Sequence, residues 1–171
     1  MRYTFREIES AQFEWSHLEL LTPGVELFFT IDRRRFNFNE AYIRVYPYVS
    51  APASRFEVWL PGIDGNDLMT FYIHTELTLS YSINTNHFRT DEFLNHDTPI
   101  LFYRLKEILQ MRFVEEQWGL NDQVYTIVCQ GYTQDGNPSR FDKCVKEVQP
   151  HRFYHPKLQL LSFKTYEPLL P

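Results

Sequence analysis

The alternation that decides the fold runs through residues 69–83, MTFYIHTELTLSYSI. Successive side chains of a β-strand point to opposite faces, so a period of two predicts strands with one buried face. Either one long strand runs through the stretch or a hairpin near Thr75-Glu76 preserves the parity. Seven large apolar residues share its odd positions: Met69, Phe71, Ile73, Leu77, Leu79, Tyr81 and Ile83.

The same alternation predicts further strands before and after this stretch. We expect them at 25–31, 41–45 and 56–60, with a closing strand at 158–166. Turn-forming residues, chiefly proline and glycine, separate these runs. For the first twenty residues the pattern indicates a short helix followed by a strand.

A helix start is indicated at Thr98-Pro99, because a capping residue followed by proline is typical of the first helical turn. Apolar residues follow at helical spacing through Met111, and Gly119 is well placed to end the helix. The sequence therefore predicts one long helix over 98–118.

Another hairpin is predicted around Asp135-Gly136-Asn137-Pro138, which lies between two alternating runs. A hairpin centred there places Val128 opposite Val145, Cys129 opposite Cys144 and Tyr132 opposite Phe141. The first and last of these pairs set apolar against apolar on one face, which favours this register.

Together these patterns predict the α+β class, as mainly antiparallel β-sheet or a small sandwich with the 98–118 helix packed on it. The 171 residues lack a repeat or a linker, so we expect a single domain over 1–171. A chain of this length buries about 70% of its unfolded surface, enough for a core without disulfides or metals.

The net charge and the N-terminal sequence limit which partners and which cellular compartment we expect. There are 17 basic and 22 acidic residues, a net charge of -5, which is a poor overall match for phosphate. The first residues have no apolar signal segment and no stretch of 18 apolar residues occurs. We therefore expect a cytoplasmic or virion-associated protein that does not interact with membranes.

Glycine is too scarce for several enzyme classes. The six glycines form neither a dinucleotide-binding fingerprint nor a phosphate-binding loop, and His-Glu-x-x-His is absent. The segment Asp64-Gly65-Asn66-Asp67 lacks the ligand spacing of a calcium loop and is predicted to be a turn. We assign no cofactor and no catalytic residue.

One alternative for the C-terminal part of the chain is a zinc site. Cys129, Cys144, His151 and His155 offer two sulfurs and two imidazoles, the donor set of a tetrahedral site. The cysteine spacing is unusual for zinc, and opposed strand cysteines could instead form a disulfide. Of the three alternatives we favour two free thiols.

Two basic segments contain aromatics. Arg33, Arg34 and Arg35 precede Phe36 and Phe38, and residues 151–157 read HRFYHPK. Such segments can hold single-stranded nucleic acid by stacking. Alternatively the phenylalanines pack inward and the arginines meet acidic groups, on this chain or on another protein, which the net charge favours.

A small hydrolase or nuclease is the enzyme alternative. It would use His96 and Asp97, or the pair His151 and His155. No spacing in the sequence specifies such a site, and acidic residues before the predicted helix are typical of helix starts.

Aromatic residues make up 17% of the chain, as 3 Trp, 11 Tyr and 15 Phe. One helix could cover a sheet only in part, so some aromatics opposite the core face should meet another chain. We therefore predict a non-catalytic protein-binding or assembly component, a homo-oligomer or a partner of another protein. A viral or phage structural subunit and an immunity-type binding protein are examples. The expected surface comprises Tyr42, Tyr46, Tyr48, Trp59 and Tyr72, with Arg33, Arg34 and Arg35.

Overall fold

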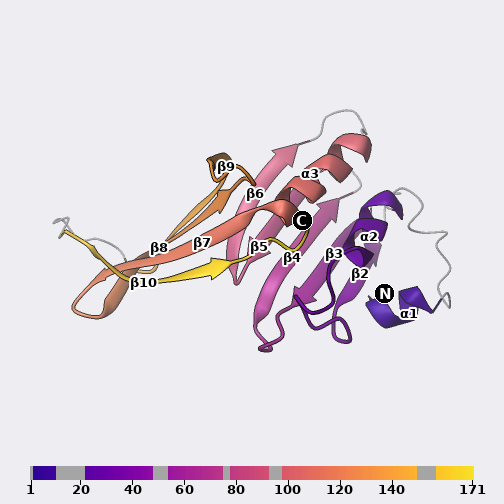
Figure 1. Cartoon of the computed structure of the whole chain (residues 1–171), viewed down its shortest axis with the longest axis horizontal. Helices are drawn as coiled ribbons and strands as arrows, with labels where there is room; N and C mark the ends of the chain where they lie inside the picture. The colour runs from indigo at the N-terminus through magenta and orange to yellow at the C-terminus, as the bar shows by residue number, and fades with distance from the viewer. Residues whose placement is uncertain (1, 11–21, 48–53, 75–77, 93–97, 150–156) are drawn as a thin grey trace. The chain divides into compact units, whose positions relative to one another are not determined.

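The computed structural model describes residues 2–10, 22–47, 54–74, 78–92, 98–149 and 157–171. Within these ranges the chain forms short helices and many strands (Figure 1). Their order along the chain is β1 (Arg2–Thr4), α1 (Phe5–Glu9), α2 (Thr22–Phe29), β2 (Tyr42–Pro47), β3 (Ser54–Pro61), β4 (Asp67–His74), β5 (Thr78–Ile83), β6 (Asn86–Glu92), α3 (Thr98–Gln110), β7 (Arg112–Leu120), β8 (Gln123–Tyr132), β9 (Pro138–Glu147) and β10 (Gln159–Tyr166).

The strands form two antiparallel sheets. One has six strands in the order β1-β2-β3-β4-β5-β6, and the other has four in the order β10-β7-β8-β9. The chain divides into two compact units, Met1–Ile108 with Leu170, and Leu109–Leu169 with Pro171. The predicted antiparallel, β-rich architecture is confirmed.

The stretch at 69–83 forms the hairpin alternative. β4 and β5 pair antiparallel with Met69 opposite Ile83 and Phe71 opposite Tyr81, and all four side chains are buried. Tyr81 also stacks on Phe88 of β6, with ring centroids 4.7 Å apart. The odd-numbered residues of this stretch thus build the core face of the six-stranded sheet, as their parity predicts.

No helix of the described residues is long and apolar enough to cross a membrane.

The strand predicted at 25–31 is wrong, because this segment contains helix α2. Leu27 and its neighbour Phe28 are both buried, and the Phe28 ring lies 5.3 Å from Phe71 of β4. Neighbouring strand residues face opposite sides of a sheet, whereas neighbouring helix residues such as Leu27 and Phe28 can both face the core. A Thr-Pro pair begins both α2 and α3, so the signal read correctly at Thr98-Pro99 was also present at Thr22-Pro23.

The long helix predicted over 98–118 is also wrong. α3 ends at Gln110, and residues 112–120 form strand β7. Asn121 and Asp122 have φ angles of 50° and 62° between β7 and β8, as a type I′ hairpin turn requires. Gly119 therefore does not end a helix. It lies in β7, where an added Cβ would come within 2.0 Å of the Gln123 carbonyl oxygen.

The N-terminal prediction is confirmed only in its first half. α1 is a short helix, and the Thr4 hydroxyl accepts from the Glu7 amide while the Glu7 carboxylate accepts from the Thr4 amide. β1 precedes this helix and pairs with β2. The strand expected after the helix falls outside the described residues.

The β8–β9 hairpin has the predicted register near its open end. Val128 lies opposite Val145 and Cys129 opposite Cys144. Closer to the turn a bulge intervenes, so Tyr132 lies opposite Pro138 and not opposite Phe141. The closing strand is confirmed as β10, which pairs with β7.

Candidate interaction surfaces

A hydrogen-bonded network occupies the face of the six-stranded sheet opposite its core face. The register places Arg44 of β2 opposite Glu57 of β3. The Glu57 carboxylate accepts from the Tyr42 hydroxyl at 2.9 Å and from the Tyr46 hydroxyl at 2.6 Å. Arg44 Nη1 donates to the Tyr46 hydroxyl at 2.9 Å and lies 3.8 Å from Glu57 Oε2. We call Tyr42, Arg44, Tyr46 and Glu57 the Glu57 network.

Cationic side chains lie over the rings of this network. The Arg2 guanidinium carbon lies 4.0 Å from the Tyr42 ring centroid, and that of Arg44 lies 5.1 Å away. The Trp59 ring lies 5.1 Å from the same ring. Burial, and then the hydrogen bond to Glu57, raise the pKa of Tyr42 to about 12. The network is a polar layer whose groups largely satisfy one another.

The predicted aromatic surface maps onto this face. Tyr42 is only 8% exposed and Tyr46 is 37% exposed, while Trp59 and Tyr72 are half-buried. Tyr48 lies outside the described residues. The structure therefore brings Tyr42, Tyr46 and Trp59 together, but it offers Tyr46 to a partner far more than Tyr42.

The three arginines lie in a separate loop between α2 and β2. Arg33 forms an ion pair with Glu9 and places its guanidinium 4.1 Å from the Phe38 ring centroid. Arg34 pairs with Asp32 at 2.7 Å, and these hydrogen bonds lower the pKa of Asp32 to about 2. Both cations thus have an acidic partner on this chain.

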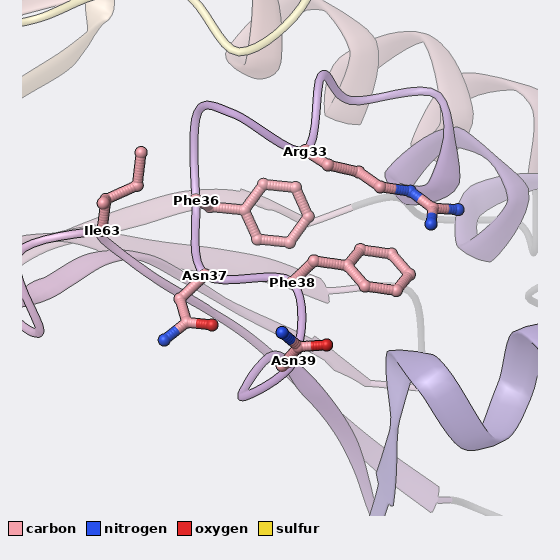
Figure 2. A pocket seen from close by; sticks show the side chains of 6 residues that line it. All are labelled: Arg33, Phe36, Asn37, Phe38, Asn39 and Ile63. Atoms are coloured by element: carbon pink, nitrogen blue, oxygen red, sulfur yellow. The ribbon is translucent and has the colours of Figure 1, made fainter.

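A pocket of about 430 Å³ lies beside this loop (Figure 2). Phe36 is buried, and its ring lies 6.0 Å from those of Phe38 and of Phe5 in α1. The Asn37 amide donates to the Pro61 carbonyl at 2.8 Å, which ties the loop to the end of β3. The phenylalanines pack mainly against the protein's own helices. This agrees with the alternative in which they pack inward and do not stack on nucleic acid bases. The lining residues are Arg33, Phe36, Asn37, Phe38, Asn39 and Ile63.

The sulfur atoms of the zinc hypothesis lie in the four-stranded sheet. Cys129 and Cys144 are opposed but free, with Cys129 buried. Burial, and then the charge of Glu115, raise the pKa of Cys129 to about 12. His151 and His155 lie outside the described residues, as do His96 and Asp97. Within the described part of the chain, no three histidine, cysteine or carboxylate side chains are grouped to hold a metal ion.

The two faces of the four-stranded sheet carry different side chains. On one face Phe113, Glu115 and Cys129 are buried, and the register places Glu115 opposite Cys129. On the other face the register joins a row across all four strands, from Phe163 through Glu116 and Val128 to Val145. A parallel row joins Leu160, Trp118, Thr126 and Glu147, and a third joins Thr165, Val114, Gln130 and Lys143. We call these twelve residues the open face.

Large apolar side chains of the open face remain exposed at both edges of the sheet. Phe163 and Leu160 of β10 are 69% and 45% exposed, and Val145 of β9 is 57% exposed. Between them the Trp118 indole donates to Glu116 Oε2 at 2.9 Å. Isolated exposed apolar residues are ordinary, so it is the alignment of this set on one sheet face that makes it a candidate interaction surface.

Reading the sequence alone missed this surface. The Val128–Val145 pairing was predicted, but only as support for the hairpin register. The signal that could have pointed further is the apolar residue at one parity in each of β8, β9 and β10. The strand order that aligns them depends on pairing between β7 and β10. These strands are neighbours in the sheet, but β8 and β9 lie between them along the chain.

Comparison with protein-family models, with curated proteins and with solved structures finds no match to this chain.

Proposed function

We propose that this protein is a non-catalytic protein-binding or assembly component and that the open face of its four-stranded sheet contacts another polypeptide. The observation that carries the proposal is the exposure of Phe163, Leu160 and Val145 on that one face. A structural subunit of a virus or phage, or an immunity-type binding protein, would use such a surface in the cytoplasm or virion.

The energetic basis is the hydrophobic effect. Burying a fully exposed side chain of this size is worth about 1.5 to 3 kcal/mol, and side chains that are 45% to 69% exposed can gain about half of that. A partner that covers both edges of the sheet would bury Phe163 and Val145 together.

The charges of the open face favour protein over nucleic acid. Its ionisable residues are Glu116, Lys143 and Glu147, so the face has no excess of positive charge. Phosphate binding requires such an excess. In the arginine loop, Arg33 and Arg34 already pair with Glu9 and Asp32, which weakens the case for a single-strand site there.

Site-specific photocrosslinking in the native host tests the proposal. A photoreactive phenylalanine analogue at position 163 should give a protein adduct of defined mass. The matched control is the same analogue at Lys164, the next residue of β10, which is also exposed but lies on the other face of the strand. Equal adducts at both positions, or none at position 163, would contradict the proposal.

A further inference from the structure

We propose that the outer edge of β9 pairs with β9 of a second copy of this chain, antiparallel, with the two-fold axis at Val145. This inference rests on the proposed function, because pairing with a second copy at the β9 edge would enlarge the open face that a further polypeptide contacts. It follows from three features of β9: the direction of its backbone hydrogen-bonding groups, its charge order and the apolar row that it completes.

β9 ends the four-stranded sheet, and no strand of the described residues pairs with its outer side. The Val148 amide donates to the Tyr125 carbonyl of β8 at 2.8 Å, so the backbone of residue 148 points into the sheet. Backbone groups alternate along an antiparallel ladder. Lys146 and Cys144 therefore also face β8, whereas Lys143, Val145 and Glu147 direct their amides and carbonyls outward.

The β9 strand of a second, antiparallel copy can pair with these three residues through its own Lys143, Val145 and Glu147. With the axis at Val145, each valine meets its equivalent, and Lys143 lies opposite Glu147 of the second copy at two symmetric positions. All of these pairs join outward-facing backbone groups, so each can exchange two hydrogen bonds. Opposite charges on directly opposed strand residues are attractive.

Other registers lose this complementarity. An axis at Lys143 opposes two lysines, an axis at Glu147 opposes two glutamates, and an axis at Lys146 again opposes two lysines. An axis at Cys144 sets Lys143 opposite Val145 and Glu147 opposite Phe141, and its one opposite-charge pair would join Lys146 to Asp142, which is fully buried. Like charges placed opposite each other on neighbouring strands are destabilising. Among the axes at residues 143–147, which pair regularly with β8, the one at Val145 is therefore favoured.

The two charges are available for this role. Lys143 and Glu147 are exposed, and within the described part of the chain neither forms an ion pair. Lysines on an edge strand usually discourage pairing with unrelated strands. Here Glu147 supplies the complementary charge four residues further on, so the edge favours its own copy over other strands.

The pairing also extends the apolar surface. A two-fold axis perpendicular to the sheet leaves both open faces on the same side of one continuous eight-stranded sheet. The row from Phe163 to Val145 would then meet its equivalent at the axis. The open faces of the two copies would then form one continuous surface. Phe163 would lie at each end of it, where a further partner could contact it.

A charge-swap cycle tests the register. Lys143→Glu and Glu147→Lys should each weaken self-association, measured by sedimentation equilibrium, by about tenfold because each opposes like charges at two positions. The double variant K143E/E147K should restore it, since the charges are exchanged but still complementary. Both residues are exposed, and circular dichroism verifies that each variant folds.

Cysteine crosslinking gives an independent measurement. Directly opposed strand residues lie about 5.5 Å apart between Cα atoms, within disulfide reach. In a Cys144→Ser background, Val145→Cys should form a covalent dimer under mild oxidation. Thr165→Cys, an exposed open-face position on the far strand β10, should not.

A monomer at all accessible concentrations, or a dimer that is indifferent to the charge swap, would overturn the β9 pairing. If the position-163 adduct then persists with a different protein, the proposed function stands without the dimer. If that adduct is absent too, both proposals fall.

Discussion

The Tyr46 hydroxyl lies 2.6 Å from Oε2 of Glu57, while the Tyr42 hydroxyl lies 2.9 Å from Oε1 of the same carboxylate. One acidic side chain therefore accepts from two phenols of a neighbouring strand and also faces Arg44. The Glu57 side chain is only 12% exposed, so these donors take the place of water as its hydrogen-bond partners. The consequences of this arrangement can be measured.

Glu57→Gln should lower the free energy of unfolding by about 1 to 3 kcal/mol, measured by urea denaturation. The amide nitrogen cannot accept from a phenol, and Arg44 loses its counter-charge. Glu26→Gln, at an exposed position of α2, is the matched control and should have almost no effect. Equal stability of the two variants would show that the network does not stabilise the sheet.

Tyr42 should make stability fall in strongly alkaline solution. Its folded pKa of about 12 exceeds the ordinary value of 10.0, so the folded state holds this proton more tightly than the unfolded state. The stabilisation is complete below pH 10 and is lost as pH rises towards 12. Tyr42→Phe should flatten the decline that denaturation measures over this window. An unchanged slope would contradict the assignment.

The two cysteines should differ in reactivity. Cys129 is buried with a pKa raised to about 12, and Cys144 is half-buried with a smaller upward shift. Because the thiolate is the nucleophile, iodoacetamide should modify native Cys144 before Cys129. Mass spectrometry of Cys144→Ser should show labelling only after denaturation. Equal labelling rates in the native chain would contradict the burial of Cys129.

Gly119→Ala should destabilise the β7–β8 hairpin. The added methyl group would lie 2.0 Å from the Gln123 carbonyl oxygen, so the backbone must shift. We expect a loss of about 1 to 3 kcal/mol in the free energy of unfolding, as for other overpacked sites. Ser162→Ala, at an exposed position of β10, is the control. An alanine variant as stable as the control would show that the hairpin absorbs the methyl group.

Sequence reasoning succeeded where a feature is determined by local alternation. The core face of residues 69–83 and the Val128–Val145 register followed from it, but the alternation fitted one long strand as well as the β4–β5 hairpin, so it did not decide between them. It failed at α2, where Phe28 and Phe29 make the apolar pattern compatible with either period. It also failed at 112–118, which was predicted to continue the helix but forms strand β7. The apolar residues there gave no sign that α3 ends at Gln110.

The candidate site divides in the same way. Parity alone placed Tyr42, Tyr46 and Trp59 on one face of the sheet, away from its core. It could not show that Glu57 would bind two of those hydroxyls, because that depends on the pairing of β2 with β3. The network therefore reduces the exposure of Tyr42, a residue first expected to meet a partner.

By itself, the sequence determined the antiparallel, aromatic-rich sheet, since the period of two is a local property of the chain. Only the tertiary structure decided which apolar residues stay exposed. Phe163 and Val145 are distant in the chain and share a row only because β7 and β8 lie between β10 and β9. Strand order is set by pairing between distant segments, and local periodicity carries no record of it.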